Sequence, residues 1–180
     1  MYAAAIARGA DVWSGFFPQD LPDDNKFDVI VFNDVLEHLP EPQCVVEYCE
    51  QRLTPGRNLV SNIPCSRGTF YQLAQLLDRI RVTGPFERMW QLHFASPHIS
   101  YFTPEQLDRL ATRSGLQKAH RSTLPSINLR DPWTRLRNDR QSSIFFSTII
   151  FVAVIMLIPV LRVLPADISL QIFRRPADRT

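Results

Sequence analysis

The chain has 180 residues, of which 45% are hydrophobic and 21% charged, and its formal net charge is +2 at pH 7. This length fits one domain, or one domain with an added segment. The near-balance of 20 basic and 18 acidic residues excludes a nucleic-acid binder that relies on bulk positive charge, and it excludes an acidic disordered chain.

The first clear element is a strand over residues 27–32, whose sequence Phe-Asp-Val-Ile-Val-Phe is almost wholly apolar. Such a run is typical of a parallel strand that is buried on both faces. Polar side chains follow it directly, with Asn33 and Asp34 at its end and Glu37 and His38 just beyond. Because ligands gather at the carboxyl ends of strands in open α/β sheets, this cluster is the first candidate site.

The following elements alternate between helices and strands. We expect strands over 58–63, 117–123 and 168–173. Helices are expected over 42–53, over 69–80 with an end at Thr83-Gly84-Pro85, and from 104 to just before Gly115. Residues 86–102, which are rich in aromatic residues and histidine, are expected to form an irregular loop. Thr103 and Gln106 have the spacing of a capping box, with Pro104 at the first helical position. The alternation predicts an α/β fold with a parallel sheet.

Three collinear stretches resemble class I S-adenosylmethionine (SAM)-dependent methyltransferases of the group that contains the ubiquinone-biosynthesis O-methyltransferases. Residues 27–42 resemble that family's fourth strand and the motif after it, and residues 53–64 its next helix end, turn and strand. Residues 98–116 are similar to its H-x-x-x-F-T-P stretch. The resemblance implies a Rossmann-like parallel sheet with helices on both faces, lacking the first two strands, plus an inserted apolar helix. Residues 11–15 would be the third strand.

The same resemblance implies that the chain is an amino-terminally truncated family member. The family's Gly-rich loop and its ribose-binding acid would lie before Met1, and no G-x-G-x-G occurs in this sequence. Four residues take the positions of cofactor-binding residues, with SAM as the cofactor: Gly15, Phe16, Asn33 and Asp34. An aromatic ring at Phe16 would stack on the adenine or fill the core, and both readings stay open.

Methyl transfer requires that donor and acceptor be held close together and, for a hydroxyl acceptor, that a proton be removed. The candidate catalytic bases are His38, His98 and His93. Asp34, Glu37 and His38 fall on one face of a helical turn and resemble the family's E-x-x-E-H stretch, which implies an optional divalent cation. Hydrogen bonding of Glu37 and His38 to neighbouring loops, and a structural role for the other histidines, are the competing interpretations.

An uncharged apolar stretch of 18 residues, 144–161, is flanked by arginines. A helix of that length would be about 27 Å long, slightly short of the ~30 Å hydrocarbon core of a bilayer. Membrane-surface or re-entrant insertion, true spanning and a core or oligomer contact all remain open. We therefore divide the chain into a partial methyltransferase domain (1–129), a basic and apolar membrane-associating insertion (130–162) and a last strand (163–176).

The predicted function is SAM-dependent methyl transfer to a small-molecule acceptor, with a hydroxyl on an amphiphilic or lipid-linked molecule preferred. The alternative is a catalytically silent, membrane-associated binding module of the same fold. Three cysteines are too few for a disulfide framework, so we expect a location on the cytoplasmic side of a membrane. No nucleic-acid partner is expected, and the oligomeric state is left open.

Overall fold

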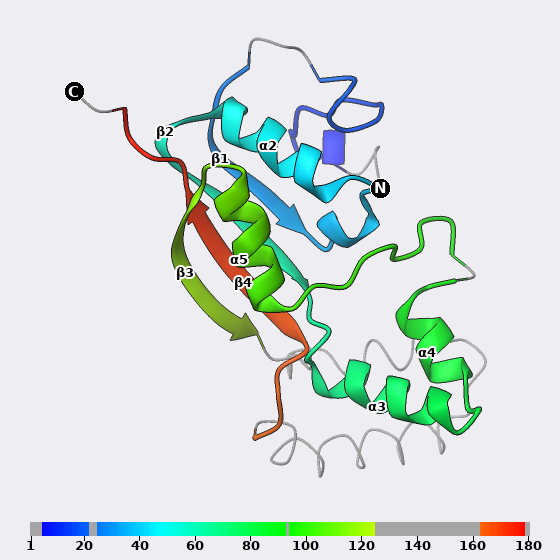
Figure 1. The fold of residues 1–180 in the computed structure, drawn as a ribbon. Helices are drawn as coiled ribbons and strands as arrows, with labels where there is room; N and C mark the ends of the chain where they lie inside the picture. The colour runs from blue at the N-terminus through cyan, green and yellow to red at the C-terminus, as the bar shows by residue number, and fades with distance from the viewer. Residues whose placement is uncertain (1–4, 22–24, 93, 125–162, 179–180) are drawn as a thin grey trace.

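A four-stranded mixed sheet forms the centre of the computed structural model, which describes residues 5–21, 25–92, 94–124 and 163–178 (Figure 1). The strands are β1 (Phe27–Asn33), β2 (Leu53–Pro64), β3 (Gln117–Leu124) and β4 (Ile168–Arg174), and their order in the sheet is β1-β2-β4-β3. β1 and β2 are parallel, but β4 runs antiparallel to both of its neighbours. The prediction of a wholly parallel sheet was therefore wrong. β4 needs no crossover helix because it inserts between two strands that run the opposite way.

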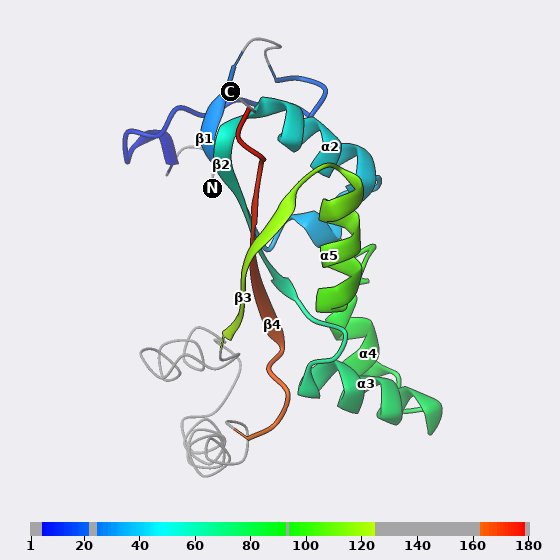
Figure 2. The same cartoon turned by 60° about the vertical axis from the view of Figure 1, so that its left-hand side comes forward.

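Two helices, α2 (Pro42–Arg52) and α5 (Pro104–Arg113), lie on the same side of the sheet, as Figure 2 shows. They belong to the connections β1-to-β2 and β2-to-β3, which step across the sheet in the same direction. Right-handed crossovers in one direction place their helices on one face. The expected covering of both faces is thus wrong for the residues that the structure describes. Val29 and Val31 are accordingly exposed, although β1 was predicted to be buried on both sides.

The core lies between this face of the sheet and the two helices. It contains Phe32, Leu59, Ile63 and Phe173 from the strands, Val45, Val46 and Cys49 from α2, and Leu107 and Ala111 from α5. The predicted capping box begins α5: the Thr103 Oγ1 accepts from the Gln106 backbone N–H, and the Gln106 side chain accepts from the Thr103 N–H. Pro104 follows in the first turn. The sequence signal for this helix start is confirmed.

A smaller helical layer stands beside the carboxyl ends of the parallel strands. It consists of α3 (Thr69–Arg79) and α4 (Gly84–Met89), and the rings of Tyr71 and Phe86 lie 6.1 Å apart between them. Gly84 and Pro85 begin α4, although they were predicted to end the preceding helix and open an irregular loop. Proline in the first helical turn lacks only an N–H that has no partner there, so it starts a helix as readily as it ends one.

The third strand predicted over residues 11–15 is absent from the structure. Residues 11–14 have no regular secondary structure, and the chain turns directly after them, with Asp20 Oδ2 accepting from the Phe16 backbone N–H at 2.6 Å. Gly15 has φ +148° and a Cβ there would lie 2.4 Å from Asp20 Oδ2, so this turn requires glycine. The edge of β1 that faces away from β2 pairs with no described residue.

The predicted apolar helix over 144–161, and the whole of the predicted insertion 130–162, lie outside the described residues. Among the helices that the structure describes, none has the length and apolar character needed to cross a bilayer.

Candidate functional site

The carboxyl end of β1 is fastened to the neighbouring strand by its polar residues. The Asn62 side-chain amide of β2 donates to Asn33 Oδ1 at 2.6 Å, and the Asp34 backbone N–H donates to the Asn62 carbonyl at 2.9 Å. Asp34 has φ +52°, in the left-handed region that costs strain for a residue with a Cβ. The chain therefore turns sharply at Asp34, and the next residues leave the plane of the sheet.

After this turn, the short 3-10 helix η1 (Leu36–His38) meets a segment some 60 residues further along the chain. The backbone N–H groups of Ile99 and Ser100 both donate to the Glu37 carbonyl, at 2.9 and 3.1 Å. These two bonds bring the histidine-rich segment against the end of β1. As a result, His38 and His98 face each other with ring centroids 4.6 Å apart.

His38 is held through one ring nitrogen and offers the other. Its Nδ1 lies 2.8 Å from the Pro97 carbonyl, and the Ser96 hydroxyl lies 3.3 Å from the same atom. A carbonyl only accepts, so Nδ1 carries the proton and neutral His38 keeps its lone pair on Nε2. No described residue contributes a hydrogen bond to that Nε2. His38 thus has the geometry of an oriented general base.

His98 has both ring nitrogens engaged. Tyr101 Oη donates to the Met89 carbonyl at 2.7 Å, so it accepts from His98 Nδ1–H at 2.9 Å. Nε2 then accepts from the Gln91 side-chain amide at 3.0 Å. Burial, with a further contribution from neighbouring His38, lowers the pKa of His98 below its ordinary value. His98 is therefore neutral near pH 7, and it positions the aromatic segment.

Glu37 is the most unusual group of the cluster. Its side chain is 1% exposed, and neither carboxylate oxygen has a hydrogen-bond partner among the residues that the structure describes. Burial raises its pKa above the ordinary value. Donor atoms of Glu37, His38 and His98 lie within 4.8 Å of one another. This group contains two of the three predicted metal ligands, and His98 stands in it where Asp34 was expected.

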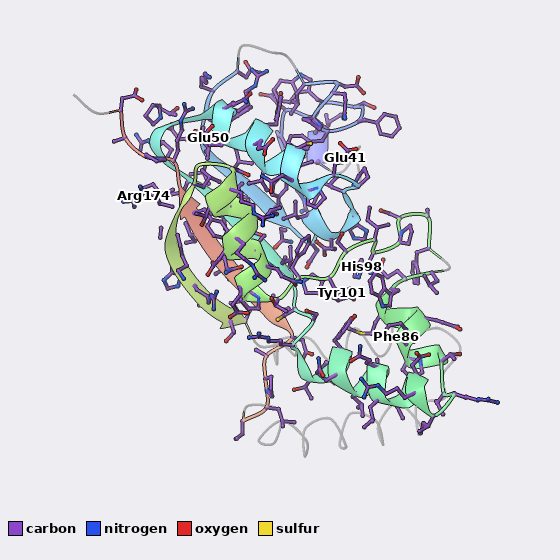
Figure 3. The ribbon with its side chains drawn as sticks, in the orientation of Figure 1. Glu41, Glu50, Phe86, His98, Tyr101 and Arg174 are labelled. Carbon is purple, nitrogen blue, oxygen red and sulfur yellow. The ribbon has the colours of Figure 1, made fainter. Side chains whose placement is uncertain are left out.

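Aromatic side chains from three segments pack on one another, with Tyr101 in contact with His98, and form what we call the aromatic wall: Tyr71 of α3, Phe86 of α4, Trp90 and Tyr101. Tyr101 lies 4.6 Å from Tyr71 and 4.9 Å from Trp90 between ring centroids. In Figure 3, His98 and Tyr101 lie between the sheet and α4, the helix to which Phe86 belongs. A cavity of about 570 Å³ adjoins this wall; Trp90, residues 99–102 and the α5 residues Gln106, Arg109, Leu110 and Arg113 line it. It is large enough for a small organic molecule.

The roles of Tyr101 and Gln91 in orienting His98 were not predicted from the sequence. The spacing of His98 and Tyr101 was a local signal, but the pairing of residues 99–100 with Glu37 depends on the folded chain. The predicted base His93 lies outside the described residues. His38 and His98, two of the predicted candidate bases, lie against each other.

The residues predicted to bind SAM fit only part of that molecule. Asn33 and Asp34 offer an amide and a carboxylate at the strand end, and Phe16, 83% exposed, offers an aromatic face. Phe17 packs against Phe32 of β1 at 5.8 Å, which keeps this segment beside β1. The space at Gly15, however, is taken by Asp20. These groups suit the polar and adenine parts of SAM, whereas the sequence has no G-x-G turn for close backbone contact.

Comparisons with known proteins agree with this architecture. The structure is similar to an S-adenosylmethionine-dependent methyltransferase from Mesorhizobium loti (TM-score 0.57, 17% identity, covering 97% of this chain and 76% of that one). It is also similar to a suggested sarcosine dimethylglycine methyltransferase from Galdieria sulphuraria (TM-score 0.56, 18% identity, covering 97% of this chain and 63% of that one). A third similar structure is the [4+2]-cyclase SpnF (TM-score 0.54, 16% identity, covering 98% of this chain and 61% of that one). At these identities the likeness shows the fold. The chain spans less than two thirds of the length of the last two structures.

No curated protein matches the sequence significantly. A family model described as a methyltransferase domain matches residues 5–121, which include β1, β2, η1, the histidine-rich segment and α5. The match thus covers the whole candidate site as well as the larger part of the chain. On this evidence the chain belongs to the methyltransferase domain family.

Proposed function

We propose that the chain supplies the acceptor side of a SAM-dependent methyltransferase, with His38 as the general base. The supporting observation is the oriented imidazole of His38, which lies beside buried Glu37 and against neutral His98 at the carboxyl end of β1. SAM supplies an electrophilic methyl group on a sulfonium when it is bound. Asn33, Asp34 and Phe16 would hold it.

In this proposal the acceptor is a hydroxyl group, and bound SAM would supply the methyl group that its oxygen receives. The hydroxyl proton passes to His38 Nε2, and the positive charge that forms on the imidazole is balanced by neighbouring carboxylates. The Pro97 carbonyl keeps the ring in the required tautomer. The aromatic wall excludes water and contacts the apolar body of the acceptor. Arg109 and Arg113 at the cavity edge suit an acceptor that also carries a negative charge.

An amphiphilic or lipid-linked acceptor is favoured by the uncharged stretch 144–161 and the arginines beside it. The chain would then work at the cytoplasmic side of a membrane. All three cysteines are free thiols, in keeping with a reducing compartment. The division into a partial methyltransferase domain, a membrane-associating insertion and a returning last strand belongs to the same proposal.

A silent binding module is the competing function, and the absence of a G-x-G turn from the sequence favours it. Isothermal titration of the full chain with SAM separates the two. Micromolar binding that weakens in Asn33→Ala but not in His38→Gln supports the enzyme. No heat at millimolar SAM supports the silent module.

Transfer itself is measured with SAM that carries a labelled methyl group and a lipid extract as the source of acceptors. We expect extractable label with the parent chain and at least about 100-fold less with His38→Gln, the range found for loss of a general base. Equal transfer by both chains would refute the role of His38. The control variant is His120→Gln, on the exposed strand β3.

A divalent cation at Glu37, His38 and His98 is a second proposal for this cluster, with Asp34 as a further ligand; His98 would bind it through Nε2 in place of the Gln91 amide. The two buried, unpartnered oxygens of Glu37 favour it. Titration of the chelator-treated chain with Mn²⁺ or Zn²⁺ tests it. Binding that is lost in Glu37→Gln supports the site, and binding that is unchanged in this variant refutes it.

A further inference from the structure

Helix α3 exposes an apolar stripe on the side that faces away from the candidate site. Leu73, Leu76 and Ile80 are 49%, 56% and 65% exposed, and only Ala74 of this helix is fully buried. Val82, just beyond the helix end, is also exposed. Soluble helices normally bury such a stripe against a core. We refer to Leu73, Leu76, Ile80 and Val82 as the α3 stripe.

The opposite side of the same helix contacts the site. At about 100° per residue, Leu73, Leu76 and Ile80 lie roughly 140–200° around the helix axis from Tyr71. Tyr71 packs on Tyr101, which hydrogen-bonds to His98. One helix, about 10 Å thick, therefore separates the α3 stripe from the aromatic wall.

The start of α3 is tied to the part of the chain that follows the uncharged stretch 144–161. Thr69 donates to the Pro165 carbonyl through both its Oγ1 and its backbone N–H, and the Phe70 N–H donates to Asp167 Oδ1. Gly68 permits this contact, because a Cβ there would lie 2.6 Å from Asp167 Cα. Val163 and Leu164, next to this junction, are exposed. In Figure 1 the chain that leads into β4 runs beside the first turn of α3.

Basic side chains border the α3 stripe. Arg79 and Arg81 flank Ile80, both are exposed, and neither forms an ion pair with any residue that the structure describes. An apolar stripe with bordering arginines is the pattern of helices that lie in the interface of an anionic bilayer. A second copy of the chain on this face would place two pairs of arginines at one contact, which is unfavourable.

We propose that the α3 stripe docks on the surface of an anionic phospholipid bilayer, next to the point where the chain continues from the stretch 144–161. Tyr71 and the aromatic wall then lie one helix thickness from the lipid headgroups. An acceptor anchored in the bilayer then has to extend its reactive group past α3, by at least about 10 Å, to reach the cavity. This inference rests on the proposed action at a membrane surface and adds a second contact that the apolar stretch alone does not provide.

The test is co-flotation of the full chain with vesicles of phosphatidylcholine alone or mixed with an equal part of phosphatidylserine. Leu76→Ser/Ile80→Ser removes half of the α3 stripe. Its matched control is Ile6→Ser/Trp13→Ser, which removes two apolar side chains of similar exposure, 49% and 57%, elsewhere on the chain. We expect the α3 variant to bind mixed vesicles at least about 10-fold more weakly than the parent and the control to bind as the parent does.

Arg79→Gln/Arg81→Gln provides an independent variant that leaves the apolar residues in place. It is expected to lose most of the preference for mixed over neutral vesicles. The proposal is overturned if the parent does not bind mixed vesicles, if the α3 variant binds them as well as the control, or if the stripe variant lowers only the oligomeric state in lipid-free solution. SAM titration of the same variants keeps a failure here distinct from a failure of the proposed activity, since SAM affinity should not change.

Discussion

The buried carboxylate of Glu37 allows the sharpest prediction, because a group needed only for folding would not be left unpartnered. Replacing it with leucine keeps a side chain of similar size and removes two oxygens that have no hydrogen-bond partner among the described residues. We expect Glu37→Leu to fold more stably than the parent chain and to lose the metal binding or the methyl transfer proposed above. Stability and function would then move in opposite directions.

The magnitude follows from the burial of the side chain. Glu37 is 1% exposed, and a buried polar group without a hydrogen bond costs about 1–3 kcal/mol in proteins. Glu37→Leu should therefore raise the free energy of unfolding by about 2 kcal/mol at neutral pH, which for a chain of this size raises Tm by roughly 4–8 °C. Glu37→Gln should gain less, because its amide is equally unpartnered.

The effect has a defined pH dependence. Burial raises the folded-state pKa of Glu37 above its ordinary value of 4.5, so the folded chain binds more protons than the unfolded chain between these two values. Glu37 therefore contributes to the stability of the folded chain through its preferential protonation. This contribution is fully present below pH 4.5 and is lost as pH rises through the folded-state pKa of Glu37. The advantage of Glu37→Leu over the parent should therefore grow from acidic to neutral pH.

Urea unfolding followed by circular dichroism measures this difference, with chelator present so that no cation occupies the cluster. Glu41→Gln, at an exposed carboxylate a few residues further on, is the control and should change stability little. A Glu37→Leu chain less stable than the parent at neutral pH would refute the reasoning. So would a difference that does not vary with pH.

Three further predictions concern the frame around the site. Thr103→Ala breaks the capping box of α5 and should cost about 1 kcal/mol in urea unfolding; a cost no greater than that of Thr112→Ala, at an exposed threonine near the other end of the helix, would contradict it. Phe173→Ala empties a fully buried position and should lower the free energy of unfolding by about 3–5 kcal/mol or prevent folding. A loss below about 1 kcal/mol would contradict the burial of this β4 residue in the core. Asp34 has a left-handed backbone conformation, so Asp34→Gly should be about 1 kcal/mol more stable than Asp34→Ala. Equal stability of the two variants would contradict this. Both variants should bind SAM more weakly than the parent chain.

Local signals were predictable from the sequence, and contacts between distant segments were not. The capping box at Thr103 was readable because its hydrogen bonds join residues three positions apart. The polar cluster after β1 was readable because strand and site are adjacent in the chain. Gly84-Pro85 misled the prediction because the same pair can end one helix or begin the next.

The antiparallel direction of β4 leaves no mark in the alternation of its residues, since the period of a strand is the same in either direction. The exposure of Val29 and Val31 depends on which face the crossover helices cover, which the strand's own residues do not encode. Burial of Glu37 and the meeting of His38 with His98 likewise depend on the hydrogen bonds from residues 99–100.

The central claim is that His38 and His98 belong to one ligand-binding site at the end of β1. Heteronuclear NMR of the histidine side chains during titration with S-adenosylhomocysteine tests it most directly. The account predicts that the imidazole signals of His38 and His98 shift together, with His98 protonated only on Nδ1, while the signal of His120 on β3 stays in place. Binding of the ligand with both site histidines unmoved would contradict the account.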